Sequence, residues 1–206
     1  MRANTIGAAC KRVLDIAGAS IALAICWPAM AAIAIAIRLI MGRPILFRQV
    51  RPGRYEHPFT LFKFRTMTEA HSPTIDPSTD AARLTRFGVF LRRFSLDELP
   101  QLWNVLKGEM SFVGPRPLLM EYLAHYTAEQ SKRHLMRPGI TGLAQVKGRN
   151  AISWEQKFHW DVWYVEHWSL WLDLKILLAT LAKIVSQEGI SQQGQATMEK
   201  FGAERR

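Results

Sequence analysis

The chain has 206 residues, a length that fits one domain with a short appended segment. Its 27 lysines and arginines against 17 acidic residues give a net charge of +10. Such an excess implies an anionic partner: a nucleic acid, a membrane surface or a phosphorylated substrate. The two cysteines, Cys10 and Cys26, are too few for a disulfide framework. This excludes the small disulfide-rich secreted proteins and favours a body that faces the reducing cytosol.

Residues 16–37 form a run of 22 residues without a charge, which is long enough to cross a bilayer as a helix. A cleaved signal peptide is the alternative, because small residues around Met30 imitate a cleavage site. The run is longer than an ordinary signal core, and the rest of the chain has the composition of a cytosolic protein. We therefore expect residues 1–41 to be a membrane segment with its flank.

Pro28 lies near the middle of this run. It cannot donate a hydrogen bond to the carbonyl of Ala24, and its ring clashes there, so it kinks or breaks the helix. Basic residues flank both ends of the run, and such residues stay on the cytoplasmic face. A helix that enters and leaves through the same leaflet satisfies both facts, whereas a straight span satisfies only one. The sequence predicts a re-entrant helix with its break at Trp27 and Pro28.

Two short β-prone runs, residues 45–50 and 59–64, are joined by a turn-rich segment and predict a β-hairpin. Alternation along the second run places Lys63 and Arg65 on one face. Residues 81–94 then carry apolar side chains at helical spacing and predict a helix.

The next stretch, residues 92–117, combines two adjacent carboxylates, Asp97 and Glu98, with several arginines. Arg92 lies just upstream, and Arg116 lies between two prolines. Adjacent carboxylates can bind a hard divalent cation, or one of them can act as a nucleophile. Guanidinium groups can hold phosphate oxygens through paired hydrogen bonds. This combination suits a reaction on phosphate.

A structural interpretation of the same acids is also open. Ser95 and Glu98 have the spacing of a capping box, in which both side chains satisfy backbone donors at the start of a helix. Pro100 complicates that interpretation, because a helix that begins at Leu96 would lose a backbone hydrogen bond there. From these residues alone, capping and catalysis both remain possible.

Two further capping boxes predict helices in the second half of the chain, one opened by Thr127 and Gln130 and one by Ser153 and Gln156. An apolar helix is expected at residues 172–185. Five of the seven tryptophans lie between Trp154 and Trp171. Aromatic residues at helical spacing are often core, but a small domain seldom buries so many indoles. Amphipathic helices that lie at the membrane interface are the favoured interpretation.

Two long motifs resemble one known family. SLDELPQLWNVLKGEMSFVGPRPL, at residues 95–118, and RPGITGLAQVKGRN, at residues 137–150, are similar to motifs of the bacterial sugar transferases, the monotopic phosphoglycosyl transferases. The similarity covers nearly the whole chain and is greatest to the small members that begin bacterial N-linked glycan assembly. In that family a re-entrant helix breaks at a Ser-Pro pair. Trp27 replaces the serine here, and an indole cannot repeat a hydroxyl-to-backbone hydrogen bond.

The resemblance implies roles for named residues. Asp97 would be the covalent nucleophile, and Glu98 would bind Mg²⁺ together with Asp97 or orient the substrates. Phosphate-binding cations are expected from the hairpin, the arginine-rich segment and the second motif: Lys63, Arg65, Arg92, Arg116 and Arg149.

The expected function is transfer of a sugar-phosphate from a UDP-sugar to undecaprenyl phosphate, with release of UMP. The donor sugar would be N-acetylated, as in di-N-acetylbacillosamine, because the compact chain resembles the N-glycan members. UDP-galactose or UDP-glucose is the alternative donor, for capsule or O-antigen synthesis. A membrane-bound protein that binds anions without catalysis is the alternative outside the enzymes. Nucleic acid is not expected as a partner, because the two acids would weaken binding to a phosphate backbone.

The expected architecture is mainly α-helical with a small β-hairpin, an N-terminal re-entrant membrane helix and interfacial amphipathic helices. Residues 42–186 would form the catalytic domain on the cytoplasmic leaflet of the inner membrane, and residues 187–206 a tail. The sequence carries no signal for the oligomeric state.

Overall fold

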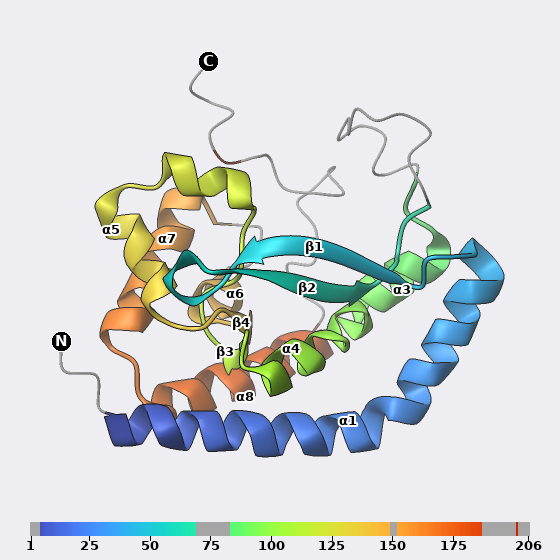
Figure 1. The fold of residues 1–206 in the computed structure, drawn as a ribbon, viewed down its shortest axis with the longest axis horizontal. Helices are drawn as coiled ribbons and strands as arrows, with labels where there is room; N and C mark the ends of the chain where they lie inside the picture. Colours follow the sequence, from blue (N-terminus) through green and yellow to red (C-terminus); the bar gives the residue numbers. More distant parts are fainter. Residues whose placement is uncertain (1–4, 69–82, 149–151, 187–200, 202–206) are drawn as a thin grey trace.

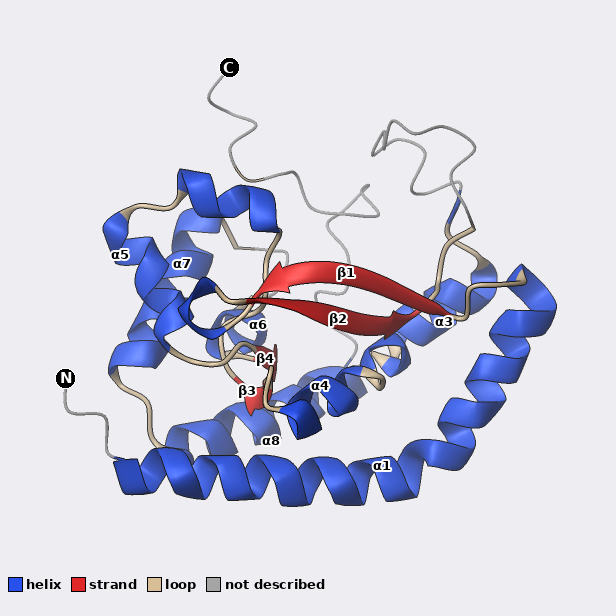
Figure 2. Cartoon of the chain, viewed as in Figure 1, coloured by secondary structure: helices blue, strands red, loops and turns tan. Residues whose placement is uncertain are grey.

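The computed structural model describes residues 5–68, 83–148, 152–186 and 201. These residues are mostly helical, with two small two-stranded sheets (Figure 2). In chain order the longer elements are α1 (Thr5–Met41), β1 (Leu46–Pro52), β2 (Pro58–Phe64), α3 (Arg86–Arg93), α4 (Gln101–Lys107), β3 (Ser111–Val113), α5 (Ala128–Ser131), β4 (Gly139–Thr141), α6 (Leu143–Lys147), α7 (Trp154–Glu166) and α8 (Leu170–Ser186). Short 3₁₀ turns connect some of them: η1 (Arg54–Glu56), η2 (Leu96–Glu98), η3 (Met120–His125) and η4 (Lys132–Leu135). The predicted mainly helical class with a hairpin is confirmed.

The first element, α1, is one helix of 37 residues with Pro28 inside it. It runs along the lower edge of Figure 1 and then bends upward around the body of the molecule. Pro28 accounts for the bend, because a proline removes one backbone hydrogen bond and its ring clashes with the preceding turn. The expected kink or break is thus a bend within a continuous helix, and Trp27 beside it is exposed. Within the described residues, α1 alone is long and apolar enough to cross a membrane.

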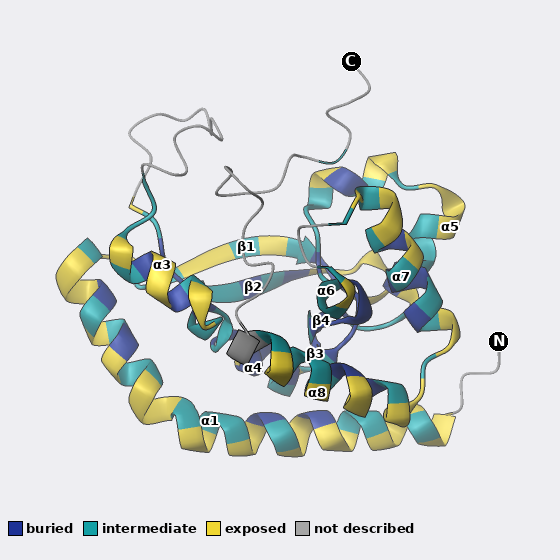
Figure 3. Cartoon of the chain, turned by 180° about the vertical axis from the view of Figure 1, so that it is seen from behind, coloured by how far each residue is buried: buried dark blue, intermediate teal, exposed yellow. Residues whose placement is uncertain are grey.

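Both halves of α1 pack against the rest of the chain. Ala19 is fully buried in a cluster with Phe59 of β2 and Val105 of α4. Ile37, beyond the bend, is fully buried in a second cluster that includes Leu91 of α3. Much of the rest of α1 is exposed (Figure 3). Large apolar side chains such as Ile25 lie on these exposed faces. The helix therefore lies against the body along its length while most of its surface stays apolar and exposed.

Polar contacts fix the first half of α1 in the same place. Lys11 forms an ion pair of 2.5 Å with Asp173 of α8. Asp15 is buried and accepts hydrogen bonds from the hydroxyl of Ser111 at 3.0 Å and the backbone N–H of Phe112 at 3.1 Å. A buried carboxylate without such partners would be strongly destabilising, so this contact fixes α1 in register against β3.

Two arginines bind backbone carbonyls near the ends of helices. Arg12 donates to the carbonyl of Val105 in the last turn of α4, at 2.6 Å. Arg65, after β2, donates to the carbonyls of Met41 and Arg43, where α1 ends. Cations are favourable at helix C-termini, where the last carbonyls lack partners within the helix. Both ends of α1 are therefore held by the body of the molecule.

The predicted hairpin is confirmed, with β1 antiparallel to β2 over the whole of both strands. Asn104 of α4 is fully buried and connects the hairpin to the helix. Its side-chain amide donates to the carbonyl of Thr60 at 2.7 Å, and its oxygen accepts from the N–H of Phe62 at 3.3 Å. This contact fixes α4, and the acidic segment just before it, beside the strand that carries Lys63.

A second sheet was not predicted. Its strands, β3 and β4, have three residues each and pair in parallel. The backbones meet closely beside this sheet, since a Cβ built on Gly139 would lie 2.1 Å from the backbone nitrogen of Gly114. This small sheet joins the two long motifs of the sequence in space.

The two capping boxes in the second half of the chain are confirmed. Thr127 and Gln130 cap α5, and Ser153 and Gln156 cap α7, each with both reciprocal hydrogen bonds. The α5 helix has four residues and continues as a 3₁₀ turn, residues 132–135.

The tryptophans of α7 and α8 are partly buried or exposed. Trp160 and Trp163 pack against the core around Tyr164, whereas Trp171 is 62 % exposed. On α8, exposed apolar residues repeat every three or four positions and form one face of the helix: Trp171, Leu174, Leu178 and Leu181. This distribution suits a helix that covers a small core on one side, and its placement at a membrane interface stays a prediction.

Candidate active site

The acidic pair lies in η2, between α3 and α4. Ser95, which precedes it, has a left-handed backbone (φ 56°, ψ 23°), and its side chain makes no capping hydrogen bond. The capping-box interpretation of Ser95 and Glu98 is therefore wrong. Pro100 lies directly before α4, where the missing N–H costs little. Both carboxylates are thus free of a role in capping the helix.

Glu98 is held by two cations. Its Oε1 accepts from Nζ of Lys63 at 2.5 Å and from Nη2 of Arg116 at 2.8 Å. Burial alone would raise the pKa of Glu98, but the charges and hydrogen bonds of Arg116 and Lys63 outweigh it and hold the pKa well below its ordinary value. Glu98 is therefore a permanent anion that draws residues from β2 and the Pro115–Pro117 turn together.

Asp97 differs from Glu98 in its partners and in the direction of its pKa shift. It is only 8 % exposed, and the described part of the chain provides it with no hydrogen bond or ion pair. Burial raises its pKa above the ordinary value, the neighbouring Glu98 acts in the same direction, and Lys63, Arg92 and Arg116 oppose the rise. The side chain is thus a carboxylate with unused oxygens inside a group of cations.

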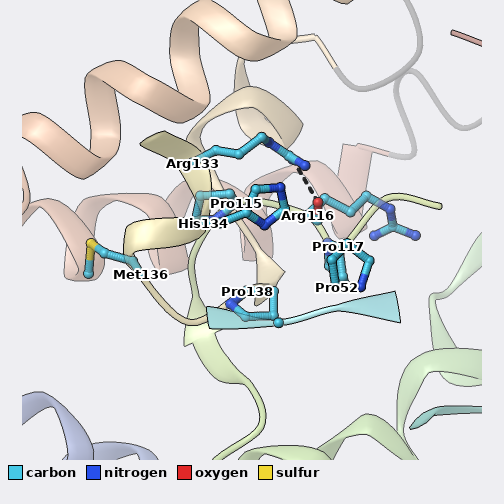
Figure 4. Close-up of a pocket in the computed structure, with 9 residues that line it drawn as sticks. Pro52, Pro115, Arg116, Pro117, Arg133, His134, Met136 and Pro138 are labelled. Carbon is cyan, nitrogen blue, oxygen red and sulfur yellow. Dashed lines mark hydrogen bonds between the residues drawn. The ribbon is translucent and has the colours of Figure 1, made fainter. Parts of the chain in front are cut away.

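Arg116 is positioned through its backbone. Arg133 is buried and donates to the carbonyl of Arg116 at 2.7 Å (Figure 4), and it pairs with Asp161 of α7 at 2.6 Å. In Figure 4 the side chain of Arg116 extends away from Arg133. The flanking Pro115 and Pro117 limit the backbone further. A buried ion pair therefore fixes the turn that presents Arg116 to Glu98.

The other predicted phosphate-binding residues lie in different surroundings. Nε of Arg92 donates to Oγ1 of Thr66 at 3.1 Å, and its charge acts on Asp97. Arg65 binds the carbonyls at the end of α1. Its expected contact with phosphate stays a prediction. Arg149 lies outside the described residues.

A metal would need ligands from the substrate. Within the described ranges, no three His, Cys, Asp or Glu side chains come together as ligands. Asp97 has unused oxygens, while Oε1 of Glu98 is already taken by two cations. Mg²⁺ often binds through one or two carboxylates plus substrate phosphates, and this donor set fits that mode only.

A largely apolar groove of about 250 Å³ begins at the acidic segment. Glu98 and Ser95 line one part of it, and Thr180 and Lys183 of α8 line another. Most of the remaining lining is apolar: Phe94, Leu96, Leu99, Leu102, Phe112, Ile140 and Val146. The site thus combines a charged cluster with an adjoining apolar groove.

Four residues near Arg116 were missed by sequence reasoning: Arg51, Arg133, Lys157 and Asp161. Arg133 and Asp161 are 28 positions apart and meet only through the packing of η4 on α7, so no local pattern marks them. Arg51 and Lys157 come from β1 and α7, and the charge of Arg116 acts on both.

Comparison with known proteins agrees with this site. The pattern of the bacterial sugar transferase family matches residues 6–187. An uncharacterized sugar transferase of Bacillus subtilis, EpsL, is 53 % identical over 93 % of this chain and 95 % of its own length. A UDP-glucose:undecaprenyl-phosphate glucose-1-phosphate transferase of Xanthomonas campestris is 42 % identical over 86 % of this chain, and a UDP-galactose-lipid carrier transferase of Erwinia amylovora is 38 % identical over 87 %.

The chain spans only 39 % and 41 % of the length of the Xanthomonas and Erwinia proteins, respectively. The family match, in contrast, extends from the start of α1 to the end of α8 and includes the whole acidic and basic cluster. The chain belongs to the bacterial sugar transferase family.

Proposed function

We propose that this protein transfers a sugar-phosphate from a UDP-sugar to undecaprenyl phosphate and releases UMP. The observation that carries the proposal is the contrast between two adjacent acids. Glu98 is fixed by Lys63 and Arg116, while Asp97 keeps unused oxygens inside the same group of cations. A structural acid pair would have no need for a buried member that none of the described residues binds.

Two displacements follow from this arrangement. An oxygen of the Asp97 carboxylate attacks the phosphorus that bears the sugar, and the bond from this phosphorus to the UMP oxygen breaks, with its electron pair leaving on UMP. An oxygen of the acceptor phosphate then attacks the same phosphorus, and Asp97 leaves as a carboxylate. Neither step requires a base, because a carboxylate and a phosphate monoester are both anionic at neutral pH.

The cations of the site have a defined task in both steps. The reaction brings anions together, and Lys63, Arg92 and Arg116 would lower their repulsion. Mg²⁺, held by Asp97, Glu98 and the phosphates of the substrate, would supply further charge neutralisation. Glu98 would orient the two cations that it binds.

The acceptor and the membrane are part of the same proposal. The apolar groove beside Glu98 is suited to an isoprenoid chain. The exposed apolar surface of α1 and α8 supports attachment to the cytoplasmic leaflet of the inner membrane. Relatives named for a donor specify UDP-glucose or UDP-galactose, so a UDP-hexose is the first candidate. The N-acetylated donor that the resemblance implied is the second.

The test is UMP release by the purified full chain with undecaprenyl phosphate and Mg²⁺, across UDP-glucose, UDP-galactose, UDP-N-acetylglucosamine and UDP-di-N-acetylbacillosamine. One donor should support turnover, and Asp97→Asn should abolish it. With donor alone, mass spectrometry should find a sugar-phosphate adduct on the peptide that carries Asp97. A variant Asp97→Asn that turns over at the wild-type rate would refute the covalent route. Absence of UMP from every donor would refute the proposed reaction.

A further inference from the structure

A second group of cations surrounds Arg116. Arg51, at the end of β1, donates from Nη1 to the carbonyl of Pro117 at 3.5 Å, and from Nη2 to the neutral amide of Gln49 at 2.6 Å. Its Nε is buried, and none of the described residues accepts a hydrogen bond from it. Arg51 therefore lies beside the turn that carries Arg116, with a donor left over.

Lys157 reaches the same region from α7. It lies one helical turn before Asp161, whose ion pair with Arg133 fixes the carbonyl of Arg116. Its ammonium lies 4.8 Å from the centre of the Trp154 ring. Arg51 of β1 and Lys157 of α7 thus both lie within reach of the charge of Arg116.

The charge of Arg116 repels those of Arg51 and Lys157. Burial, together with the charge of Arg116, lowers the pKa of Arg51 to about 10. Burial also lowers the pKa of Lys157 to about 8, again with a contribution from Arg116. Like charges disfavour one another, and the acids Glu121 and Asp161 offset part of this effect at Arg51 and Lys157, respectively. The one carboxylate bound to Arg116 among the described residues, Glu98, is already shared with Lys63.

We propose that Arg51, Arg116 and Lys157 form the binding site for the phosphate of the departing UMP. This inference rests on the proposed function and goes beyond it by adding two residues outside the acidic cluster, Arg51 and Lys157, to Arg116 as ligands of the leaving group. Arg116 is the common member, because it also contacts Glu98 beside Asp97.

The chemistry of phosphoryl transfer supports this assignment. The attacking and leaving oxygens lie roughly in line, on opposite sides of the phosphorus. Arg92, Lys63 and Arg116 act on Asp97, and Arg116 also acts on Arg51 and Lys157. In this proposal the group that Asp97 displaces leaves toward Arg116, where Arg51 and Lys157 add further positive charge. UMP leaves with an additional negative charge, which these cations would neutralise.

The experiment measures UMP binding by calorimetry to the full chain in lipid nanodiscs, in an Asp97→Asn background that separates binding from turnover. Arg51→Gln should weaken UMP binding by roughly tenfold or more, because a charge-assisted hydrogen bond is lost. Uridine, which lacks the phosphate, should bind as weakly to the variant as to its parent. Arg48→Gln is the matched control: the same charge is removed from an exposed position on the same strand, so UMP binding should not change.

Unchanged UMP binding in Arg51→Gln would overturn the assignment, and so would an equal loss for uridine and UMP, which indicates a structural role. Melting temperatures identify a variant that does not fold. In that case Lys157→Gln takes its place, since it should weaken the binding of UMP and spare that of uridine. This test and the test of the proposed function can have different outcomes. If no donor releases UMP but UMP binding depends on Arg51, the binding site is supported and the proposed reaction is refuted.

Discussion

Asp97 and Glu98 are neighbours in the chain, yet their surroundings push their pKa values in opposite directions. Two adjacent carboxylates divided in this way can take separate roles, one as a fixed anion and one as a reactive group. The difference arises from which side chain reaches Lys63 and Arg116. Left-handed geometry at Ser95 contributes, because it sets the direction in which η2 leaves α3.

The raised pKa of Asp97 predicts a trade between activity and stability. Because the folded state favours the protonated form, ionisation of Asp97 destabilises the fold, and this cost grows as the pH rises through the folded-state pKa. Asp97→Asn should therefore abolish turnover and raise the free energy of unfolding at pH 7. The gain should shrink as the pH falls toward the ordinary carboxyl range, about 4. Denaturant unfolding at neutral and acidic pH checks this, and a variant whose gain is larger at acidic than at neutral pH would contradict it.

The contribution of Glu98 to the free energy of unfolding should have the opposite pH dependence. Its folded-state pKa is lowered, so its contribution to stability is present above the unfolded-state pKa and is lost as the pH falls through the folded value. Glu98→Gln should lower the free energy of unfolding at pH 7 by about 2 kcal/mol, since Lys63 and Arg116 lose their shared partner and Arg116 is partly exposed.

Turnover separates the roles of Glu98. An orienting or metal-binding residue leaves residual turnover in Glu98→Gln, and higher Mg²⁺ should restore part of it. A rate that Mg²⁺ does not change and that higher pH partly recovers would instead identify Glu98 as an essential base. Lys107→Gln is a suitable control, because Lys107 forms an exposed ion pair with Glu109.

At the scale of elements, the Arg133–Asp161 pair joins η4, α7 and the Pro115–Pro117 turn. Both side chains are buried, and Arg133 also donates to the carbonyl of Arg116. Asp161→Ala should destabilise the protein by about 3–5 kcal/mol, because it leaves a buried guanidinium without a counter-ion. Lys132→Ala changes a neighbouring exposed cation and should stay within about 1 kcal/mol of wild type.

A double replacement tests the positioning role of this pair. Arg133→Leu with Asp161→Leu removes both charges, and its stability should return close to that of wild type. Its kcat should still fall, because the carbonyl of Arg116 loses its donor and the turn is less restrained. A double variant with full kcat would show that the pair stabilises the fold without orienting Arg116. Melting curves and steady-state kinetics provide the two measurements.

The predictability of the elements followed their length and local signals. The hairpin and the capped helix α7 were predicted because their signals, alternation of residues along a strand and a capping box, each involve only a few adjacent residues. The β3–β4 sheet was missed because three-residue strands carry no periodicity, and their pairing depends on the close approach of Gly114 and Gly139. The sequence left it undecided whether Ser95 caps a helix. In the structure its backbone is left-handed and its side chain makes no capping hydrogen bond.

The residues of the site were also predictable only where local signals in the sequence mark them. Asp97, Glu98, Lys63, Arg92 and Arg116 were identified from charge and resemblance, and the structure brings them together. Arg65 is also basic and lies two positions from Lys63, yet it binds the end of α1. Sequence alone could not show this contact, because it depends on where the end of α1 lies against the body, and phosphate binding by Arg65 stays a prediction.

At the scale of the whole molecule, the course of α1 decides how the protein meets the membrane. Its 37 residues would extend about 55 Å as a straight helix, well beyond the hydrocarbon core. Lys11 and Asp15 nevertheless bind the body near one end, and Arg65 holds the other end. Both ends of α1 are thus tied to one small domain, and the prediction that the helix enters and leaves the same leaflet still needs a test in a membrane.

The topology is open to a direct test. If α1 is re-entrant, residues 1–11 and the body from residue 42 onward share the cytoplasmic side. A variant with Cys10 and Cys26 replaced and a new cysteine at Ala3 should then be protected from a membrane-impermeant thiol reagent in intact cells. Labelling of this parent would mean a true span, and the re-entrant proposal would have to be abandoned.

Pro28 provides the second half of this test. Pro28→Leu or Pro28→Ala restores a backbone donor in the middle of α1 and should straighten the helix. A straight helix of this length cannot keep both ends at the body, so part of the population should expose the cysteine at Ala3 to the reagent. The contacts of Lys11 and Asp15 oppose this change, and adding Asp15→Asn to the Pro28 variant should therefore increase the labelled fraction. Equal protection of all variants would show that the body holds α1 in place without help from the bend.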